Sequence, residues 1–232
     1  MQTSIQIDTP DGVFHAHVAR PAGDTPAPAV VVLHEVFGAN ADMRKTCDEL
    51  ASQGYVAICP DLLWRIEPGI DLTDRTPAEI DKAVALYAAF DVGNGVRDAV
   101  RTIEVARTLP GTTGKVGVLG FCLGGLLSFL VNARAGADAT VAYYPGSADK
   151  YVSEAAAVRS PLLMHLGTED EYIPPAAQQL IVGALCGRPA EIHRYVGRSH
   201  AFARHGGSGY DEAAATLANG RSAAFLAKYL KT

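Results

Sequence analysis

Two kinds of hydrophobic pattern alternate along this chain. Short runs of consecutive apolar residues are typical of strands that are covered on both faces of a sheet, and longer stretches with an apolar residue every three or four positions are typical of amphipathic helices. Before this alternation begins, two segments that alternate apolar and polar residues, 4–7 and 13–19, flank Asp11-Gly12. Because Asp-Gly between such segments is a strong hairpin signal, the chain is expected to open with an antiparallel hairpin.

The alternation that follows predicts an α/β fold, with a mainly parallel central sheet and helices on both of its faces. We expect the central strands at 29–33, 55–59, 115–119, 139–143, 161–166 and 191–195. We expect helices at 41–53, 77–90, 95–109, 126–134, 175–185 and 209–229, with an irregular segment at 62–74. Since no linker, repeat or low-complexity segment interrupts this order, the sequence indicates a single domain over residues 1–232.

Composition narrows the class of protein. A chain of 232 residues with 48% hydrophobic and 19% charged residues can bury a large core, and a net charge of −5 without a basic cluster argues against a nucleic-acid partner. The first twelve residues do not resemble an export signal and no apolar run is long enough for a membrane span, so we expect a soluble cytoplasmic protein with no membrane partner. The four cysteines are widely spaced and suggest neither a disulfide framework nor a metal site, and we expect no cofactor.

A short motif between the strand at 115–119 and the helix at 126–134 carries candidate chemistry. Gly120-Phe-Cys122-Leu-Gly124 has the form of a nucleophile elbow, with cysteine where serine is usual. Small residues two before and two after the nucleophile let the strand and the helix pass close together, and a helix N-terminus favours the reactive thiolate. A free cysteine is otherwise most often a small buried hydrophobic residue, so the motif alone is about as often structural as catalytic. Cys122 is the candidate nucleophile.

Partners for this nucleophile are expected at the carboxyl ends of other strands, where functional residues of open α/β sheets gather. Asp170 and His200 each follow a predicted strand, and the order Cys122, Asp170, His200 is the nucleophile–acid–histidine order of α/β-hydrolases. In such a triad the imidazole pairs with the thiol and the carboxylate orients the imidazole. Glu169 and Glu171 remain alternatives for the acid.

Acyl transfer also needs N–H donors for the oxyanion. In this kind of fold one donor follows the nucleophile, here Leu123, and another comes from the loop after an early strand, here Val36. Glu35 lies in the same loop, where a carboxylate is as often merely solvated as functional. We assign no catalytic role to the neighbouring His34.

Four motifs in order resemble the dienelactone hydrolase family, also called carboxymethylenebutenolidases, over nearly the whole chain. They are His-Glu-Val-Phe-Gly at 34–38, Cys-Pro-Asp-Leu at 59–62, Gly-Phe-Cys-Leu-Gly-Gly at 120–125 and Ser-His-Ala-Phe-Ala-Arg at 199–204. The resemblance implies an α/β-hydrolase fold and a Cys122, Asp170, His200 triad. It also implies hydrolysis of an enol-lactone, dienelactone, to maleylacetate.

The same resemblance implies roles for residues around the triad. The glutamate that matches Glu35 contacts the cysteine and helps to form the thiolate when substrate binds. The arginine that matches Arg204 binds the substrate carboxylate, a task suited to the guanidinium fork. Phe37 and Tyr87 would line the substrate pocket.

One departure from the family pattern affects the substrate. A second carboxylate-binding arginine is expected on the helix before Ala89-Phe-Asp91, but Ile80 and Val84 stand there, and Ala201 stands where serine is common. The expected function is therefore a cysteine hydrolase of small enol-lactones or esters, carboxylated ones first. The alternative is a non-catalytic small-acid-binding or redox-responsive thiol protein on the same scaffold. The sequence does not indicate an oligomeric state.

Overall fold

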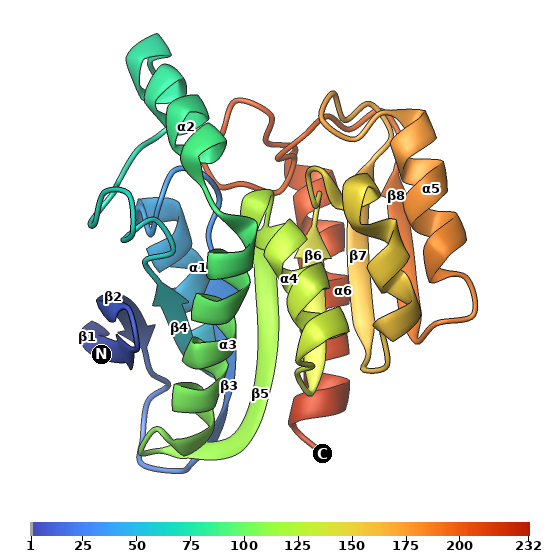
Figure 1. The fold of residues 1–232 in the computed structure, drawn as a ribbon. Helices are drawn as coiled ribbons and strands as arrows, with labels where there is room; N and C mark the ends of the chain where they lie inside the picture. The colour runs from blue at the N-terminus through green and yellow to red at the C-terminus, as the bar shows by residue number, and fades with distance from the viewer. Residues whose placement is uncertain (1) are drawn as a thin grey trace. The chain divides into compact units, whose positions relative to one another are not determined.

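The computed structural model describes residues 2–232, and the chain forms two compact units that divide after Gly117 (Figure 1). The first unit contains the N-terminal hairpin and the first half of the strand and helix alternation. The second contains the rest, including Cys122. That residues 1–232 act as one domain stays a prediction.

The strands of the first unit confirm the expected hairpin. β1 (Gln2–Thr9) pairs antiparallel with β2 (Gly12–Ala19), and the Thr9 hydroxyl donates to the Gly12 carbonyl at 2.8 Å across the turn. β2 pairs antiparallel with β4 (Val56–Pro60), which pairs in parallel with β3 (Ala27–Leu33), so the strand order in this unit is β1-β2-β4-β3. Every residue of β3 and β4 is buried, as their continuous apolar runs predict.

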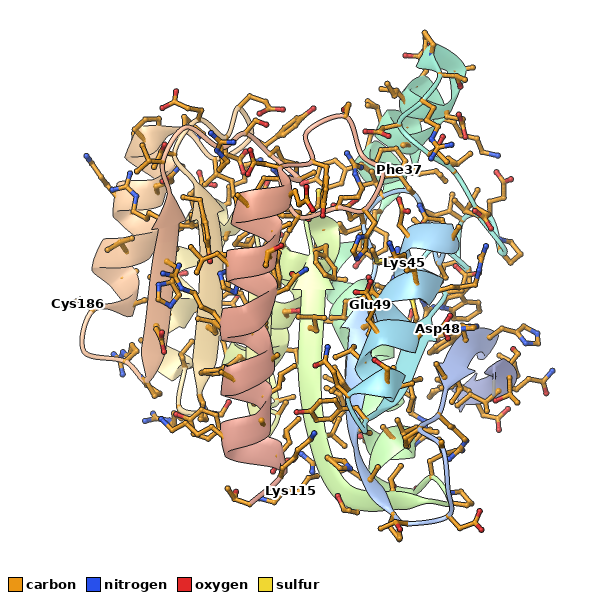
Figure 2. The ribbon with its side chains drawn as sticks, turned by 180° about the vertical axis from the view of Figure 1, so that it is seen from behind. Phe37, Lys45, Asp48, Glu49, Lys115 and Cys186 are labelled. Carbon is orange, nitrogen blue, oxygen red and sulfur yellow. The ribbon has the colours of Figure 1, made fainter. Side chains whose placement is uncertain are left out.

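Three helices complete the first unit: α1 (Ala41–Ser52), α2 (Pro77–Ala89) and α3 (Val92–Thr108). Each begins after a side chain that caps it, and Asp91 moves the start of α3 to Val92, ahead of the expected Gly95, because its carboxylate accepts the N–H of Asn94 at 2.7 Å. α1 and α3 cover opposite faces of these strands. Figure 2, seen from behind, shows α1 in front, with Lys45, Asp48 and Glu49 along it.

In the second unit β6 (Ala139–Tyr143), β7 (Leu162–Gly167) and β8 (Ala190–Tyr195) are parallel neighbours. β5 (Thr112–Phe121) begins in the first unit and ends in the second, where it lies beside β6. α4 (Leu123–Arg134) and α5 (Pro175–Leu185) cover one face of β6–β8, and α6 (Glu212–Leu230) covers the other (Figures 1 and 2). The parallel order brings the carboxyl ends of these strands to one edge.

Three features of the second unit differ from the sequence-based expectation. α4 begins at Leu123, directly after Cys122, because the elbow turn is shorter than expected. α6 begins at Glu212, after Asp211 accepts the N–H of Ala214 at 2.9 Å, so the expected start at Gly209 is too early. The 3-10 helix η1 (Ala148–Ala157) was not expected, since such short turns lack the 3.6-residue periodicity that identifies an α-helix. Within residues 2–232 the structure contains no helix with the length and apolar character that crossing a membrane requires.

Candidate active site

Cys122 occupies a strained turn between β5 and α4. Its backbone has φ 53° and ψ −112°, a conformation that costs a non-glycine residue about 1–3 kcal/mol. Two main-chain hydrogen bonds hold it: the Cys122 N–H donates to the Tyr143 carbonyl at 3.1 Å, and the Cys122 carbonyl accepts the N–H of Leu126 at 3.0 Å. The strand before it and the helix after it therefore fix the position of the sulfur.

Glycines on both sides of Cys122 make this turn possible. A Cβ atom at Gly120 would lie 2.0 Å from the Gly124 carbonyl oxygen, and one at Gly125 would lie 2.4 Å from the Tyr143 carbonyl oxygen. Real Cβ atoms do not approach backbone so closely. The sequence motif identified Gly120 and Gly124, and the structure adds Gly125, which lets α4 pass against the end of β6.

Asp170 follows β7 and is held by its own turn. Its Oδ1 accepts the N–H groups of Tyr172, at 2.9 Å, and Ile173, at 3.1 Å. The Nδ1 atom of His200 lies 3.0 Å from Oδ1 and 2.9 Å from Oδ2 of the same carboxylate. Because Asp170 is buried and both oxygens are used, its orientation is set before any substrate arrives.

The two alternative acids are placed differently. Glu171 accepts the main-chain N–H of His200 at 3.3 Å, and Glu169 accepts the hydroxyl of Thr168 at 3.4 Å. Of the three neighbouring carboxylates, Asp170 is the one in hydrogen-bond distance of the imidazole.

His200 presents its second nitrogen toward the elbow side of the site. Nε2 is buried and has no hydrogen-bond partner among the described residues. The rings of Tyr144 and Tyr172 contact the imidazole edge-on, with ring centroids 5.0 and 4.8 Å away. Aromatic neighbours on two sides limit rotation of the ring, which leaves Nε2 available for a reacting group.

The charge balance at His200 favours the imidazolium. Burial alone would lower the pKa of His200, but the negative charge of the Cys122 thiolate and the hydrogen-bonded Asp170 carboxylate outweigh it and hold that pKa well above its usual value. The Cys122 sulfur therefore interacts electrostatically with the imidazole even though no hydrogen bond of good geometry reaches Nε2.

Arg204 and Leu123 are the other predicted site residues of the second unit. Leu123 is the first residue of α4, so its main-chain N–H is one of those that a helix leaves without an intrahelical partner. Arg204 lies four residues after His200, and its main-chain N–H donates to the Ala201 carbonyl at 3.0 Å. Ala201 has φ 57°, so strain accompanies the histidine loop as it does the elbow.

The first unit holds the remaining predicted site residues. Glu35, Val36 and Phe37 form the loop after β3, in which Glu35 and Phe37 are buried and Val36 is partly exposed (Figure 2 labels Phe37). The Phe37 carbonyl accepts the N–H of Leu72 at 2.9 Å, which ties this loop to the segment before α2. Tyr87 lies on α2, where it is 39% exposed.

The structure also contains a serine–histidine contact outside the predicted triad. Ser222 Oγ lies 2.9 Å from His165 Nε2 and 2.7 Å from the Tyr143 hydroxyl, and His165 Nδ1 lies 2.8 Å from the Tyr195 hydroxyl. Burial, with charges on His193 and Arg221, lowers the pKa of His165 to about 3, which makes it a weak base. Because Ser222 and His165 are buried and the serine lies inside α6, this network is suited to joining α6 to the sheet.

Sequence reasoning missed several contributors to the site. Tyr144 directly follows the predicted strand at 139–143. Because functional residues of open α/β sheets gather at the carboxyl ends of strands, the sequence could have indicated it. Tyr172 follows Asp170 by two residues, but nothing in the sequence indicates that its ring reaches His200. His34, given no role above, makes two buried hydrogen bonds in the loop after β3.

Comparison with known proteins places this arrangement in a family. The family model of the dienelactone hydrolases matches residues 14–230. The carboxymethylenebutenolidase of Pseudomonas putida is 42% identical over 225 residues, which cover 96% of this chain and 95% of that protein. A provisionally named carboxymethylenebutenolidase of Azospirillum brasilense is 44% identical over 224 residues, with 95% of each chain covered.

A solved structure extends the likeness to the fold. The crystal structure of a candidate dienelactone hydrolase from Klebsiella pneumoniae has a TM-score of 0.84 and 27% identity to this chain, and it covers 99% of this chain and 100% of its own. The predicted fold class, a mainly parallel α/β-hydrolase sheet with an antiparallel N-terminal hairpin, is confirmed. The chain belongs to the dienelactone hydrolase family and is a hydrolase that resembles the carboxymethylenebutenolidases.

Proposed function

We propose that this protein hydrolyses small carboxylated enol-lactones, with dienelactone as the leading substrate and maleylacetate as the product, by a Cys122, His200 and Asp170 triad. The observation that supports this proposal most directly is the pair of contacts from His200 Nδ1 to the Asp170 carboxylate, 3.0 and 2.9 Å, with the elbow cysteine near the other side of the ring. The names of the relatives supply the substrate class.

The proposed reaction begins with attack of the Cys122 thiolate on the lactone carbonyl carbon. A sulfur–carbon bond forms, and the N–H groups of Leu123 and Val36 stabilise the oxyanion of the tetrahedral intermediate. When the intermediate collapses, the ring carbon–oxygen bond breaks and the imidazolium of His200 gives its proton to the leaving enolate. The product at this stage is a thioester of Cys122 that still carries the opened chain.

The second half of the reaction consumes water. Neutral His200 takes a proton from water as its oxygen attacks the thioester carbon, and the sulfur–carbon bond breaks to regenerate the thiolate beside the imidazolium. The released acid carries the enol, which becomes a ketone. Asp170 keeps the imidazole in the Nδ1–H tautomer throughout, which leaves Nε2 to exchange the proton.

Substrate binding is assigned to residues around this centre. Arg204 would pair with the substrate carboxylate through its guanidinium fork, and Phe37 and Tyr87 would line the pocket. Glu35 would receive the thiol proton when substrate arrives, so that the thiolate forms beside the imidazolium of His200, and Glu35 would return this proton to the sulfur when the product leaves. Ile80 and Val84 are exposed apolar side chains on α2, so a second carboxylate contact is not expected from them.

The nucleophile can be tested with a matched pair of cysteine variants. Cys122→Ala should lose essentially all turnover of p-nitrophenyl acetate, and Cys186→Ala, which removes the exposed thiol at the end of α5, should keep the wild-type rate (Figure 2). Equal rates for wild type and a folded Cys122→Ala would refute the triad.

The substrate can be tested separately. Rates with dienelactone, a neutral lactone and p-nitrophenyl acetate should show a preference for the acidic lactone that disappears in Arg204→Ala. Arg194→Ala, at an exposed arginine on β8, should keep the preference. Equal turnover of acidic and neutral lactones by the wild type would contradict carboxylate anchoring and leave the nucleophile assignment intact.

A further inference from the structure

We propose that His34 is a positioning residue for the oxyanion hole, because its imidazole fixes the peptide group that carries the Val36 N–H. The proposal rests on the function proposed above, in which that N–H stabilises the tetrahedral intermediate. It concerns one ring and one peptide group in the first unit.

Two buried hydrogen bonds define the state of the His34 ring. Nε2 lies 2.9 Å from the main-chain nitrogen of Leu62, and Nδ1 lies 2.5 Å from the Glu35 carbonyl oxygen. The Leu62 N–H can only donate, so Nε2 must be the acceptor. Nδ1 therefore carries the hydrogen and donates it to the Glu35 carbonyl.

The Glu35 carbonyl and the Val36 N–H belong to one planar peptide group. In a trans peptide these two groups point in opposite directions, and the described chain contains no cis peptide bond. A donor that holds the carbonyl in place therefore also holds the direction of the N–H. The Gly38 N–H supports the same carbonyl from a second side, at 3.4 Å.

Burial makes the His34 contact rigid and keeps the ring neutral. The side chain is fully buried, and desolvation lowers the pKa of His34 despite the opposing effects of the Glu35 carbonyl and of Asp61. A neutral ring keeps Nε2 as the acceptor for Leu62, so the tautomer does not change over the neutral pH range. Further along the loop, Gly38 has φ +82° and lies so close to the Ile70 carbonyl that a Cβ atom would be 2.0 Å from it. Close packing thus fixes the Gly38 end of the loop, and His34 holds the Glu35–Val36 peptide nearer β3.

The two nitrogens of His34 can be replaced one at a time. The amide nitrogen of asparagine lies at the same distance along the side chain as Nδ1, and the amide oxygen of glutamine lies at that of Nε2. His34→Asn can keep the donor to Glu35 and lose the link to Leu62, whereas His34→Gln can keep the acceptor for Leu62 and lose the donor to Glu35. Both variants disturb the buried site, so they form a matched pair.

Two rates separate positioning from general damage. Removal of an oxyanion donor lowers kcat by about 10²–10³, so we expect His34→Gln to lower kcat for p-nitrophenyl acetate by at least ~10-fold while His34→Asn stays within ~3-fold of wild type. Alkylation of Cys122 by iodoacetamide is a displacement that forms no oxyanion, and it should stay within ~2-fold in both. Mass spectrometry of the Cys122 peptide distinguishes it from alkylation at Cys186.

Equal losses of kcat in His34→Asn and His34→Gln, or a loss of Cys122 alkylation that parallels the loss of hydrolysis, would overturn the proposal. If His34→Gln does not fold, a folded His34→Asn that loses kcat more than ~10-fold would also overturn it, and one that keeps kcat would support it. Failure of the proposed function has a different signature, because complete alkylation of Cys122 in the wild type would then leave hydrolysis unchanged.

Discussion

Replacing Asp170 with asparagine should separate the orientation of His200 from the fold around it. Asp170 Oδ1 accepts the N–H groups of Tyr172 and Ile173 at 2.9 and 3.1 Å, so an asparagine oxygen is expected to stay with these two donors. Its NH₂ group would then face His200 Nδ1, where the carboxylate now lies 2.9 Å away. Because two donors cannot share that position, the imidazole would move its hydrogen to Nε2.

This tautomer cannot accept a proton from water at Nε2, which the hydrolysis of the thioester requires. A wrong histidine tautomer in a triad lowers kcat by about 10⁴-fold, which corresponds to about 5.5 kcal/mol of transition-state stabilisation. The variant also loses one of the charges that raise the pKa of His200, so the imidazolium becomes less stable. The measurement is kcat for p-nitrophenyl acetate at neutral pH, with the melting temperature taken in parallel.

A second variant provides the control. The free energy of unfolding of Asp170→Asn should lie within ~1 kcal/mol of that of the wild type, because the asparagine oxygen still accepts the N–H groups of Tyr172 and Ile173. Asp170→Ala removes the oxygen that accepts the N–H groups of Tyr172 and Ile173, leaves Ile173 only the longer bond to the Asp170 main-chain carbonyl at 3.3 Å, and should cost a further ~1–3 kcal/mol. A folded Asp170→Asn enzyme that retains kcat within ~10-fold of wild type would refute this account of the triad.

Three further results are expected. Gly120→Ala should not form the native elbow, since its Cβ would lie 2.0 Å from the Gly124 carbonyl oxygen, and soluble protein with a wild-type melting temperature would contradict this. In Cys122→Ala the His200 ring should titrate at lower pH in an NMR experiment, because the thiolate that raises its pKa is gone, and an unchanged titration would disprove the electrostatic coupling. Ser222→Ala should lower the free energy of unfolding by ~1–3 kcal/mol in a denaturant titration yet keep kcat within a few-fold, and loss of activity in the folded variant would assign the serine a catalytic role.

The sequence predicts an element well where a local pattern of residues determines its structure. The hairpin at Asp11-Gly12 and the buried strand β3 follow from local patterns and are confirmed. Helix starts depend on which polar residue caps the helix, and Asp91 and Asp211 cap at positions that periodicity alone does not identify. A 3-10 segment such as η1 has no comparable signal.

The same distinction applies to the candidate site, where local sequence predicts some features and others depend on the folded structure. The order of nucleophile, acid and histidine is visible in the sequence because each follows a strand. The choice of Asp170 among three adjacent carboxylates depends on turn geometry, since a change of one residue points the side chain elsewhere. The aromatic contacts to His200 and the hydrogen bond from Leu62 to His34 join residues that are far apart in the chain, so no local pattern predicts them.

The backbone conformation of the elbow does not depend on whether the nucleophilic atom is sulfur or oxygen. The backbone of Cys122 is held by its own N–H and carbonyl groups and by the glycines around it, and within the described residues its side chain makes no capping hydrogen bond to α4. A serine could therefore take the same position with the turn unchanged. Evolution can exchange sulfur for oxygen chemistry on such a scaffold by a single codon change, and the surrounding charges, above all those at His200, then decide whether the new nucleophile works.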